Sequence, residues 1–557
     1  MAERLAEQAS EAVLGANPFV GIDARQVAAD TVGWAGRMAL RPRALAGEAA
    51  GIARELGRIA AGRSLVTPAP GDKRFGDPTW QENPAFRRLL QSYLTLTAGA
   101  HRLVDQADLE PLGRERAHFA VTLIADALAP TNSPASNPAA VKRAFETAGR
   151  SLVRGTRQLS HDLRHNGGMP ALVDERPFTV GGNIATSPGA VVYRNEVLEL
   201  IQYRPSTETV HERPLVVIPP QINKFYVLDL APGRSFTEYA VSQGIPYFAI
   251  SWRNPTAEQR SWGLDTYVRA CVRAIDAVVA ITGSPQVNLM GLCAGGVTLS
   301  ALLGHLAAKG KLDRVASATL CVAMLDMRSP SMIGLFATDS AIARALRRSR
   351  ERGILDGGEM ARVFAWMRPN DLVWNYWVNN YLLGADPPAF DILFWNADNT
   401  RLPARLHADF LDLYLRNPLP RNGAARVLGT PIDLGAVDIP TYVLAGTSDH
   451  IVPWQAAYRS TQIFGGRPEF VLSSSGHIQS IVNPPGNPKA SYFHGGRTGD
   501  DPDAWLAGAT HSKGSWWEHW ADWLGRHSGE RRPAPSRLGG RRHAPGTAAP
   551  GRYVLQR

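Results

Sequence analysis

Apolar residues recur at two different spacings along the 557-residue chain, and the spacing changes near residue 190. Before that point, segments such as DARQVAADTVGWAGRMAL and RERAHFAVTLIADALA place apolar residues three and four positions apart, the period of an amphipathic helix. Proline-rich joints such as VTPAPGDKRFGDPTW separate these segments. The pattern predicts a mainly helical N-terminal domain over residues 1–190. We interpret it as a packing or docking unit, because no cluster of reactive residues stands out in it.

From Val191 onward the apolar residues come in short runs that are rich in β-branched side chains. The run AVVYRNEVLELIQY predicts a hairpin around Asn195. Further predicted strands are RPLVVIPP, IPYFAISW, QVNLMG, ATLCVAML, IPTYVLAG and PEFVLS, most of them separated by helical segments. This alternation predicts the α/β fold class, with a buried, mostly parallel sheet covered by helices on both faces. We assign it to a catalytic domain over residues 191–525.

A strand, a tight turn and a helix are predicted in VNLMGLCAGGVTLSALLGHLAAKG. The turn holds Gly-x-Cys-x-Gly, with Cys293 at the position where α/β-hydrolases place the serine of Gly-x-Ser-x-Gly. Gly291 and Gly295 suit a turn that excludes bulky side chains, and the helix N-terminus behind the thiol favours the thiolate. We therefore predict an α/β-hydrolase core with Cys293 as nucleophile. Cys271 and Cys321, in helical and strand sequence, are interpreted as packing residues.

Two residues that could serve Cys293 follow later strands, in the order nucleophile, acid, base that this fold uses. Asp449 lies just past the strand in YVLAGTSDHIVPW, and His477 lies just past the next strand, in FVLSSSGHIQS. Because the carboxyl ends of parallel strands meet at one edge of a sheet, both side chains are expected near the thiol. We predict a triad of Cys293, His477 and Asp449. His450 adjoins Asp449 too closely to be oriented by it, and we interpret it as structural.

An oxyanion hole needs two backbone N–H groups that point at the oxygen of a tetrahedral intermediate. Ala294, the residue after the nucleophile, is expected to supply one of them. The other is expected from the loop after an earlier strand, in VVIPPQINKFY, where Ile222 or Asn223 is the candidate.

More than a hundred residues, 326–437, interrupt the alternation of strands and helices between ATLCVAML and IPTYVLAG. Their sequence is helical and aromatic, as in FAWMRPNDLVWNYWVNNYLLG. An insertion at this place in a hydrolase sheet is expected to form a cap over the active site. Its aromatic side chains either form the core of the cap or line an apolar tunnel for an acyl chain.

The positive charge of the chain is concentrated at its end. Residues 526–557 hold eight arginines and one acidic residue, Glu530, and thus seven of the ten net positive charges. This stretch is rich in Pro, Gly and Arg, so we predict a disordered basic tail that folding does not require. The rest of the chain carries few net charges, and no nucleic-acid partner is expected.

The first residues lack the basic and apolar regions of a signal peptide, and no apolar run approaches the roughly 18–20 residues of a membrane span. Three cysteines are too few for a disulfide framework. We therefore expect a cytoplasmic protein without a membrane span. No metal-ligand cluster or phosphate-binding loop is evident in the sequence, so neither a metal nor a cofactor is expected.

The segment GSWWEHWADWLG places Trp516, Trp520 and Trp523 four and three positions apart, on one face of a helix. We predict that this face packs on the catalytic domain. The alternative is that this face is exposed and makes contacts outside the chain.

Seven motifs together resemble those of the polyhydroxyalkanoate synthases: PPQINKFYVLDL, SWRNP, GLCAGG, FWNADNTRLP, AGTSDHIVPW, SGHIQSIVNPP and GSWWEHWADWL. The family's Cys, Asp and His fall on Cys293, Asp449 and His477. The resemblance implies an acyltransferase that polymerises (R)-3-hydroxyacyl-CoA into a polyester, with an acyl thioester on Cys293 and release of CoA. It also implies a single-subunit (class I or class II) enzyme that forms a homodimer at the surface of cytoplasmic polyester granules.

Two other functions fit the same residues. A cysteine-dependent thioesterase or hydrolase of the same superfamily would release a free acid, and a granule-associated, non-catalytic protein would keep the scaffold without turnover. The intact set of Cys293, Asp449 and His477 favours an enzyme. Thiol chemistry favours polymer synthesis, because acyl transfer from CoA to Cys293 exchanges one thioester for another and keeps the acyl group activated. A serine would trap it as an oxoester.

Overall fold

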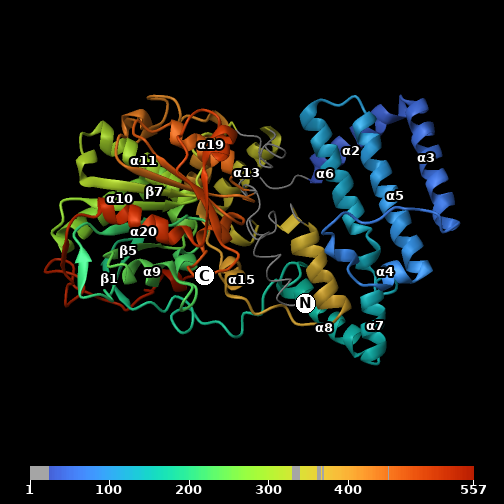
Figure 1. The fold of residues 1–557 in the computed structure, drawn as a ribbon, viewed down its shortest axis with the longest axis horizontal. Helices are drawn as coiled ribbons and strands as arrows, with labels where there is room; N and C mark the ends of the chain where they lie inside the picture. The colour runs from blue at the N-terminus through green and yellow to red at the C-terminus, as the bar shows by residue number, and fades with distance from the viewer. Residues whose placement is uncertain (1–23, 329–338, 360–364, 367–368, 450) are drawn as a thin grey trace.

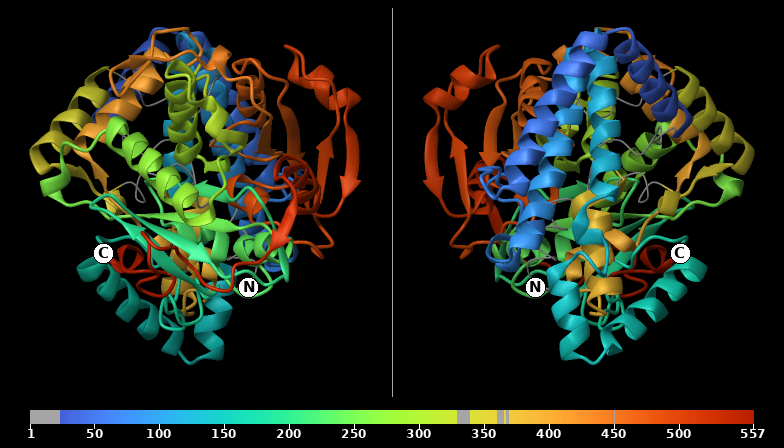
Figure 2. Two further views of the ribbon diagram at one scale, coloured as in Figure 1. Left: turned by 90° about the vertical axis from the view of Figure 1, so that its left-hand side faces the viewer. Right: turned by 90° about the vertical axis from the view of Figure 1, so that its right-hand side faces the viewer.

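The computed structural model of the chain describes residues 24–328, 339–359, 365–366, 369–449 and 451–557. A helical part and an α/β part lie side by side along the long axis of the molecule (Figure 1). Figure 2 views these two parts from opposite ends of that axis. None of the helices among the described residues is both long enough and apolar enough to cross a membrane.

The α/β part is built on one sheet, which among the described residues has ten strands in the order β1-β2-β5-β4-β6-β7-β12-β13-β14-β15. The strands from β5 to β13 in this order are parallel, and antiparallel pairs complete both sides. The predicted α/β-hydrolase fold with a mostly parallel sheet is confirmed, including the hairpin around Asn195. The last two strands of the sheet were not predicted. The bounds are β1 (Gly189–Arg194), β2 (Leu198–Tyr203), β4 (Leu215–Ile218), β5 (Tyr247–Trp252), β6 (Val287–Leu292), β7 (Val315–Cys321), β12 (Thr441–Gly446), β13 (Glu469–Ser473), β14 (Ser491–His494) and β15 (Thr510–Lys513).

Helices cover both faces of the sheet, because successive side chains of a strand point to opposite sides. In β6, Leu289 belongs to the core that includes α10 (Leu264–Thr282) and α11 (Ala294–Ala308). Met290 belongs to the opposite core, which includes α20 (Trp516–His527). Both faces of the central strands are therefore buried, which explains their nearly continuous apolar sequences.

The tryptophan face of α20 packs on the sheet, as predicted. Trp516, Trp520 and Trp523 are all buried, and the indole N–H of Trp520 donates a hydrogen bond to Thr319 Oγ1 of β7 at 3.1 Å. The alternative of an exposed contact face is therefore wrong for these three side chains.

Helices make up most of the described residues before the sheet. Several begin with proline in the first turn, and Asn83 and Asn137 cap α5 and α7 by accepting hydrogen bonds from backbone N–H groups of the first turn. The last helix ends at His165, and an extended segment then leads to β1. The bounds are α2 (Ala24–Ala39), α3 (Pro42–Ala60), α4 (Thr79–Glu82), α5 (Pro84–Gln106), α6 (Pro111–Ala127), α7 (Pro138–Glu146) and α8 (Arg150–His165).

The insertion between β7 and β12 contacts both parts of the molecule. The Tyr381 hydroxyl donates to Asp162 Oδ2 of α8 at 2.7 Å, and the Thr400 hydroxyl donates to the Gln221 carbonyl, in the loop after β4, at 2.8 Å. The insertion thus joins the N-terminal helices to the loop that is expected to carry an oxyanion donor. Its described helices are α13 (Asp339–Arg352), the π-helical η6 (Asn370–Trp374) and η7 (Trp377–Leu382), α15 (Asp391–Ala397), α16 (Ala404–Arg416) and the short η8 (Leu434–Ala436).

The prediction of a disordered tail over residues 526–557 is wrong. In this segment, β16 (Arg531–Pro533) pairs antiparallel with β3 (Thr209–His211). Further along, the Gly546 N–H and the Thr547 carbonyl exchange hydrogen bonds of 2.8 Å with Val191 at the outer side of β1. Composition misleads here because backbone hydrogen bonds hold the tail, and these need no apolar side chains. The tail covers a strand edge that would otherwise be open.

A buried carboxylate also anchors the tail. Glu199, on β2, is 0% exposed, and its Oε2 accepts hydrogen bonds from the backbone N–H groups of Arg552 at 2.8 Å and Tyr553 at 2.9 Å. Its Oε1 pairs with the guanidinium of Arg194. The end of the tail is therefore part of the folded α/β unit.

Candidate active site

Cys293 is the single residue between β6 and α11, and its backbone has a conformation that residues other than glycine rarely adopt. Its φ is 51° and its ψ is −120°. The Cys293 N–H donates to the Cys321 carbonyl of β7 at 2.9 Å, and the Cys293 carbonyl accepts from the Gly296 N–H at 2.9 Å. Neighbouring backbone thus holds the strained residue from both sides. This is the sharp strand-to-helix turn that exposes a nucleophile in α/β-hydrolases.

The glycines on either side of Cys293 are required by close backbone contacts. A Cβ on Gly291 would lie 2.8 Å from the Gly295 carbonyl oxygen, and a Cβ on Gly295 would overlap the Ile218 carbonyl oxygen at the end of β4. The first turn of α11 therefore packs directly against the loop that follows β4. Any side chain at Gly295 would separate the thiol from this loop.

His477 and Asp449 lie together on one side of the thiol. Asp449 follows β12, and His477 is the first residue of α18 (His477–Ile481), which follows β13. His477 Nδ1 is 2.7 Å from Asp449 Oδ2, and the His477 side chain also hydrogen-bonds to Cys293. Asp449 Oδ1 accepts the N–H groups of Ile451 and Val452, each at 2.9 Å. Both carboxylate oxygens are therefore engaged, which fixes the plane of the imidazole.

The electrostatic surroundings favour the charged form of His477. Burial opposes that charge, but the Asp449 carboxylate and the Cys293 sulfur outweigh it and raise the pKa of His477 to about 10. A histidine with this pKa is protonated at neutral pH. The arrangement therefore places a proton donor beside Cys293, with the proton on His477 available for a leaving group.

The two predicted oxyanion donors lie on neighbouring segments. Ala294 is the first residue of α11, and Ile222 is half-buried in the loop after β4. The Gln221 side-chain amide donates to Thr298 Oγ1 at 2.9 Å, and Thr298 Oγ1 in turn donates to the Ala294 carbonyl at 3.1 Å. The loop is thus pinned to the helix turn next to the thiol. Asn223, the other candidate, forms a β-bridge with Asn399 of the insertion.

The other cysteines and His450 were also considered from the sequence. Cys271 and Cys321 are buried, and burial raises the pKa of both thiols. His450 lies outside the described residues. Over the described ranges, no cluster of three or more His, Cys, Asp and Glu side chains could hold a metal ion.

A buried ion pair next to the site was not predicted from the sequence. Lys224 Nζ, at the end of the loop that carries Ile222, lies 2.6 Å from Asp398 Oδ1 of the insertion. Burial lowers the pKa of Lys224, and the Asp398 carboxylate opposes that shift. One feature of the sequence could have indicated this pair. Lys224 and Asp398 each have uncharged residues on both sides, within the motifs PPQINKFYVLDL and FWNADNTRLP.

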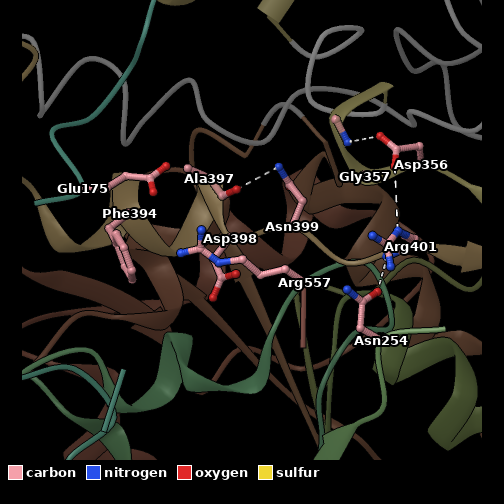
Figure 3. Close-up of a pocket in the computed structure, with 11 residues that line it drawn as sticks. Glu175, Asn254, Asp356, Gly357, Phe394, Ala397, Asp398, Asn399, Arg401 and Arg557 are labelled. Atoms are coloured by element: carbon pink, nitrogen blue, oxygen red, sulfur yellow. Dashed lines mark hydrogen bonds and ion pairs between the residues drawn. The ribbon is translucent and has the colours of Figure 1, made fainter. Parts of the chain in front are cut away.

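A cavity of about 240 Å³ opens beside this ion pair (Figure 3). Its lining mixes charges: Arg401 lies 3.9 Å from Asp356, and Asp398 and Arg557 also face it. Asn254 accepts a hydrogen bond from the Arg401 N–H at 2.9 Å. None of the three predicted triad residues is among the residues that line it.

Two protein families match the chain in adjoining and overlapping regions. Residues 71–240 match the family described as "Poly-beta-hydroxybutyrate polymerase (PhaC) N-terminus". Residues 214–484 match the alpha/beta hydrolase fold. The second match covers the segments that carry Cys293, Asp449 and His477.

Curated relatives match over nearly the whole chain. "Poly(3-hydroxyalkanoate) polymerase 1" of Ectopseudomonas oleovorans is 51% identical over 100% of this chain and 99% of its own length. "Poly(3-hydroxyalkanoate) polymerase 2" of the same organism is 54% identical, with 90% of each chain covered. The "Poly(3-hydroxyalkanoate) polymerase subunit PhaC" of Cupriavidus necator is 40% identical over 89% of this chain and 85% of its own length.

Among solved structures, an esterase from Exiguobacterium antarcticum is similar to 53% of this chain and 93% of its own, at 14% identity and a TM-score of 0.30. The mouse alpha/beta hydrolase domain-containing protein 10 covers 53% of this chain and 95% of its own, at 12% identity and a TM-score of 0.30.

Proposed function

Because the chain belongs to the poly(3-hydroxyalkanoate) polymerase family, and is thus an acyltransferase of polyester synthesis, we propose that it polymerises (R)-3-hydroxyacyl-CoA through an acyl thioester on Cys293. The observation that carries the proposal is the chain of contacts from Cys293 to His477 to Asp449, with the thiol on a strained turn. CoA enters as part of the substrate and leaves as product. The proposal requires no other cofactor and no metal.

The first step is acyl transfer to the enzyme. The Cys293 thiolate attacks the thioester carbonyl carbon, and the resulting oxyanion accepts hydrogen bonds from the N–H groups of Ala294 and Ile222. The carbon–sulfur bond to CoA then breaks, and protonated His477 gives its proton to the departing CoA thiolate. One thioester replaces another, so the acyl group remains activated on Cys293.

The second step lengthens the chain. The 3-hydroxyl of another 3-hydroxyacyl-CoA attacks the acyl group on Cys293, and His477 takes the hydroxyl proton as the Cys293 thiolate leaves. The product is an acyl-CoA that is one unit longer. It can acylate Cys293 again and release its CoA, so each added monomer releases one CoA.

Asp449 fits an orienting role in both steps. One of its oxygens holds His477 Nδ1, and the other accepts two backbone N–H groups. The carboxylate therefore keeps the imidazole in the tautomer that presents its other nitrogen to the thiol. We propose this role in preference to a direct action of Asp449 on the substrate hydroxyl.

The nature of the product bears on where the enzyme works. A growing polyester is apolar and separates from water, so we propose that the enzyme works at the surface of cytoplasmic polyester granules and, like its family, as a homodimer. Light scattering of the purified chain tests the dimer. Co-sedimentation with newly formed polymer tests the association with granules.

The decisive experiment follows CoA release from 3-hydroxybutyryl-CoA and 3-hydroxydecanoyl-CoA and identifies the other product. Insoluble polyester together with one CoA per monomer supports the proposal. Free 3-hydroxy acid would replace it with a thiol hydrolase. Absence of CoA release from both substrates would leave only a non-catalytic role.

A further inference from the structure

The loop Gln221–Lys224, which carries the candidate oxyanion donor Ile222, is held at both ends by buried polar side chains. Gln221 is 3% exposed and Lys224 is 6% exposed. Gln221 bonds to α11 through Thr298, as described above. Lys224 bonds to segments that lie far along the chain.

The Lys224 ammonium joins three segments in the interior. Its Nζ lies 2.6 Å from Asp398 Oδ1 of the insertion and donates to the Val554 carbonyl of the tail at 2.6 Å. The second carboxylate oxygen of Asp398 accepts the Tyr226 hydroxyl at 2.8 Å. Val554 is itself buried, at 1% exposure. A buried ammonium is stable only while such partners stay in place.

Side chains of the insertion donate hydrogen bonds to backbone carbonyls of the same loop. The Trp395 indole N–H donates to the Lys224 carbonyl at 2.7 Å. The Thr400 hydroxyl donates to the Gln221 carbonyl at 2.8 Å. The tail is secured in turn by Asn254, whose N–H donates to Gln556 Oε1 at 3.3 Å. The insertion and the tail together therefore fix where the loop stands relative to α11.

Position matters here because an oxyanion hole works only when both donors reach the same oxygen. Removal of one such donor costs about 10²–10³-fold in rate, and a displacement of about 1 Å costs about 10²-fold. The Ala294 N–H is fixed by the turn at Cys293. The Ile222 N–H is fixed by the contacts of the loop.

We propose that Lys224, through its bonds to Asp398 and to the Val554 carbonyl, is a positioning residue that holds the Ile222 N–H in register with the Ala294 N–H. Lys224 does not touch the substrate. The proposal rests on the proposed function, because an oxyanion hole matters only if Cys293 accepts an acyl group. It assigns to the tail and the insertion a direct influence on acyl transfer.

Two reactions of the same thiol test this assignment. Acylation by 3-hydroxybutyryl-CoA passes through an oxyanion, whereas alkylation by iodoacetamide is a displacement at a saturated carbon and needs no oxyanion hole. Both rates are measured at Cys293 by mass spectrometry, with acyl-CoA held below one equivalent. Lys224→Met is expected to lower the acylation rate about 10²-fold and to leave the alkylation rate within about threefold of wild type.

The double variant Lys224→Met/Asp398→Asn separates positioning from stability. It removes the unpaired buried carboxylate, so its unfolding midpoint is expected to return toward wild type while acylation stays low. Arg531→Ala is the matched control in the tail, because Arg531 donates to the carbonyls of Thr209 and Gln243, away from this loop. Its acylation rate is expected to stay within about twofold of wild type.

Should Lys224→Met fail to fold, Thr298→Val tests the other end of the loop. Valine matches threonine in volume but cannot accept the hydrogen bond from Gln221, so acylation is again expected to fall far more than alkylation. Equal loss of both rates, or unchanged acylation, overturns the proposal. If wild type is alkylated at Cys293 but is never acylated, the proposed function fails first, and this assignment falls with it.

Discussion

Two sides of Cys293 are built in contrasting ways. On one side, Asp449 and His477 follow the neighbouring strands β12 and β13 respectively, and their contact spans 28 residues of chain. On the other side, Lys224 secures the loop of Ile222 through partners 174 and 330 residues away, in the insertion and in the tail.

The two sides serve different parts of the reaction: His477 and Asp449 serve proton transfer, and the loop of Ile222 serves oxyanion stabilisation. The imidazole and the carboxylate depend on the adjacent ends of two paired parallel strands. The oxyanion side depends on segments that the sheet does not contain. We therefore expect proton transfer to be impaired mainly by substitution of His477 or Asp449 themselves. Oxyanion stabilisation should also be impaired by substitutions far from the thiol.

The largest effect is expected when the Cys293 sulfur, which both sides serve, is removed. Cys293→Ala is expected to reduce CoA release by at least about 10⁴-fold, because no nucleophile remains to accept the acyl group. Alanine fits the space of the turn, so the unfolding midpoint should stay close to wild type. Release of CoA by the well-folded variant would refute the assignment of Cys293.

The other two cysteines provide the control. Cys271→Ala and Cys321→Ala are expected to retain CoA release, because both thiols are buried and their raised pKa keeps them protonated. Each variant is expected to lose about 1 kcal/mol of unfolding free energy from reduced packing. Iodoacetamide should label Cys293 alone in the native wild-type protein.

The next largest effect is expected from substitutions that impair proton transfer alone. His477→Gln is expected to lower single-turnover acylation about 10³-fold, since the proton donor to the departing CoA is lost while the oxyanion donors remain. Asp449→Asn is expected to slow acylation and chain elongation by similar factors, because the carboxylate acts through His477 in both steps. Elongation measured apart from acylation checks this. A much larger loss in elongation would mean that Asp449 acts on the substrate hydroxyl.

A smaller effect is expected on the remote side. Deletion of residues 546–557 would uncover the edge of β1 and remove two N–H donors from buried Glu199 and the Val554 carbonyl from Lys224. We expect a loss of about 3 kcal/mol in unfolding free energy, measured by urea denaturation. The exposed pair Arg541→Ala/Arg542→Ala is the control, with a change of less than about 0.5 kcal/mol. An unchanged midpoint after deletion would show that the tail does not contribute to the fold.

The turn at Cys293 could be predicted because its cause is local. A strand, two glycines and a helix occur within a few residues, and the steric reason for Gly291 lies only four residues away, at Gly295. Gly295 itself is required by the distant carbonyl of Ile218, which the structure alone reveals. The order of Asp449 and His477 could be anticipated for a related reason: parallel strands bring their carboxyl ends to one edge.

The tail and the Lys224 pair could not be predicted, because their causes are not local. Arg, Pro and Gly in residues 526–557 gave no sign that β1 offers an open edge or that β2 offers a buried Glu199. Likewise, Lys224 and Asp398 acquire meaning only when the insertion folds onto the loop. Apolar periodicity detects side-chain burial, whereas these contacts are made by backbone groups and by isolated charges.

The last expected effect concerns pH and isolates the charge on the proton-transfer side. The pKa of His477 is raised from 6.5 to about 10, chiefly because Asp449 and Cys293 outweigh the penalty of burial. Between these two pH values, the folded protein holds a proton that the unfolded chain has lost. The stabilisation by His477 is therefore complete below about pH 6.5 and disappears as pH rises through about 10, with a slope of at most about 1.4 kcal/mol per pH unit. Urea denaturation of Cys293→Ala and Cys293→Ala/His477→Gln from pH 7 to 9.5 measures the part that Asp449 supplies, because a proton passed from the thiol to His477 would leave the proton count of that pair unchanged. The stability advantage of the variant that keeps His477 should shrink as pH rises. Parallel stability curves would show that Asp449 does not keep His477 protonated in the folded protein.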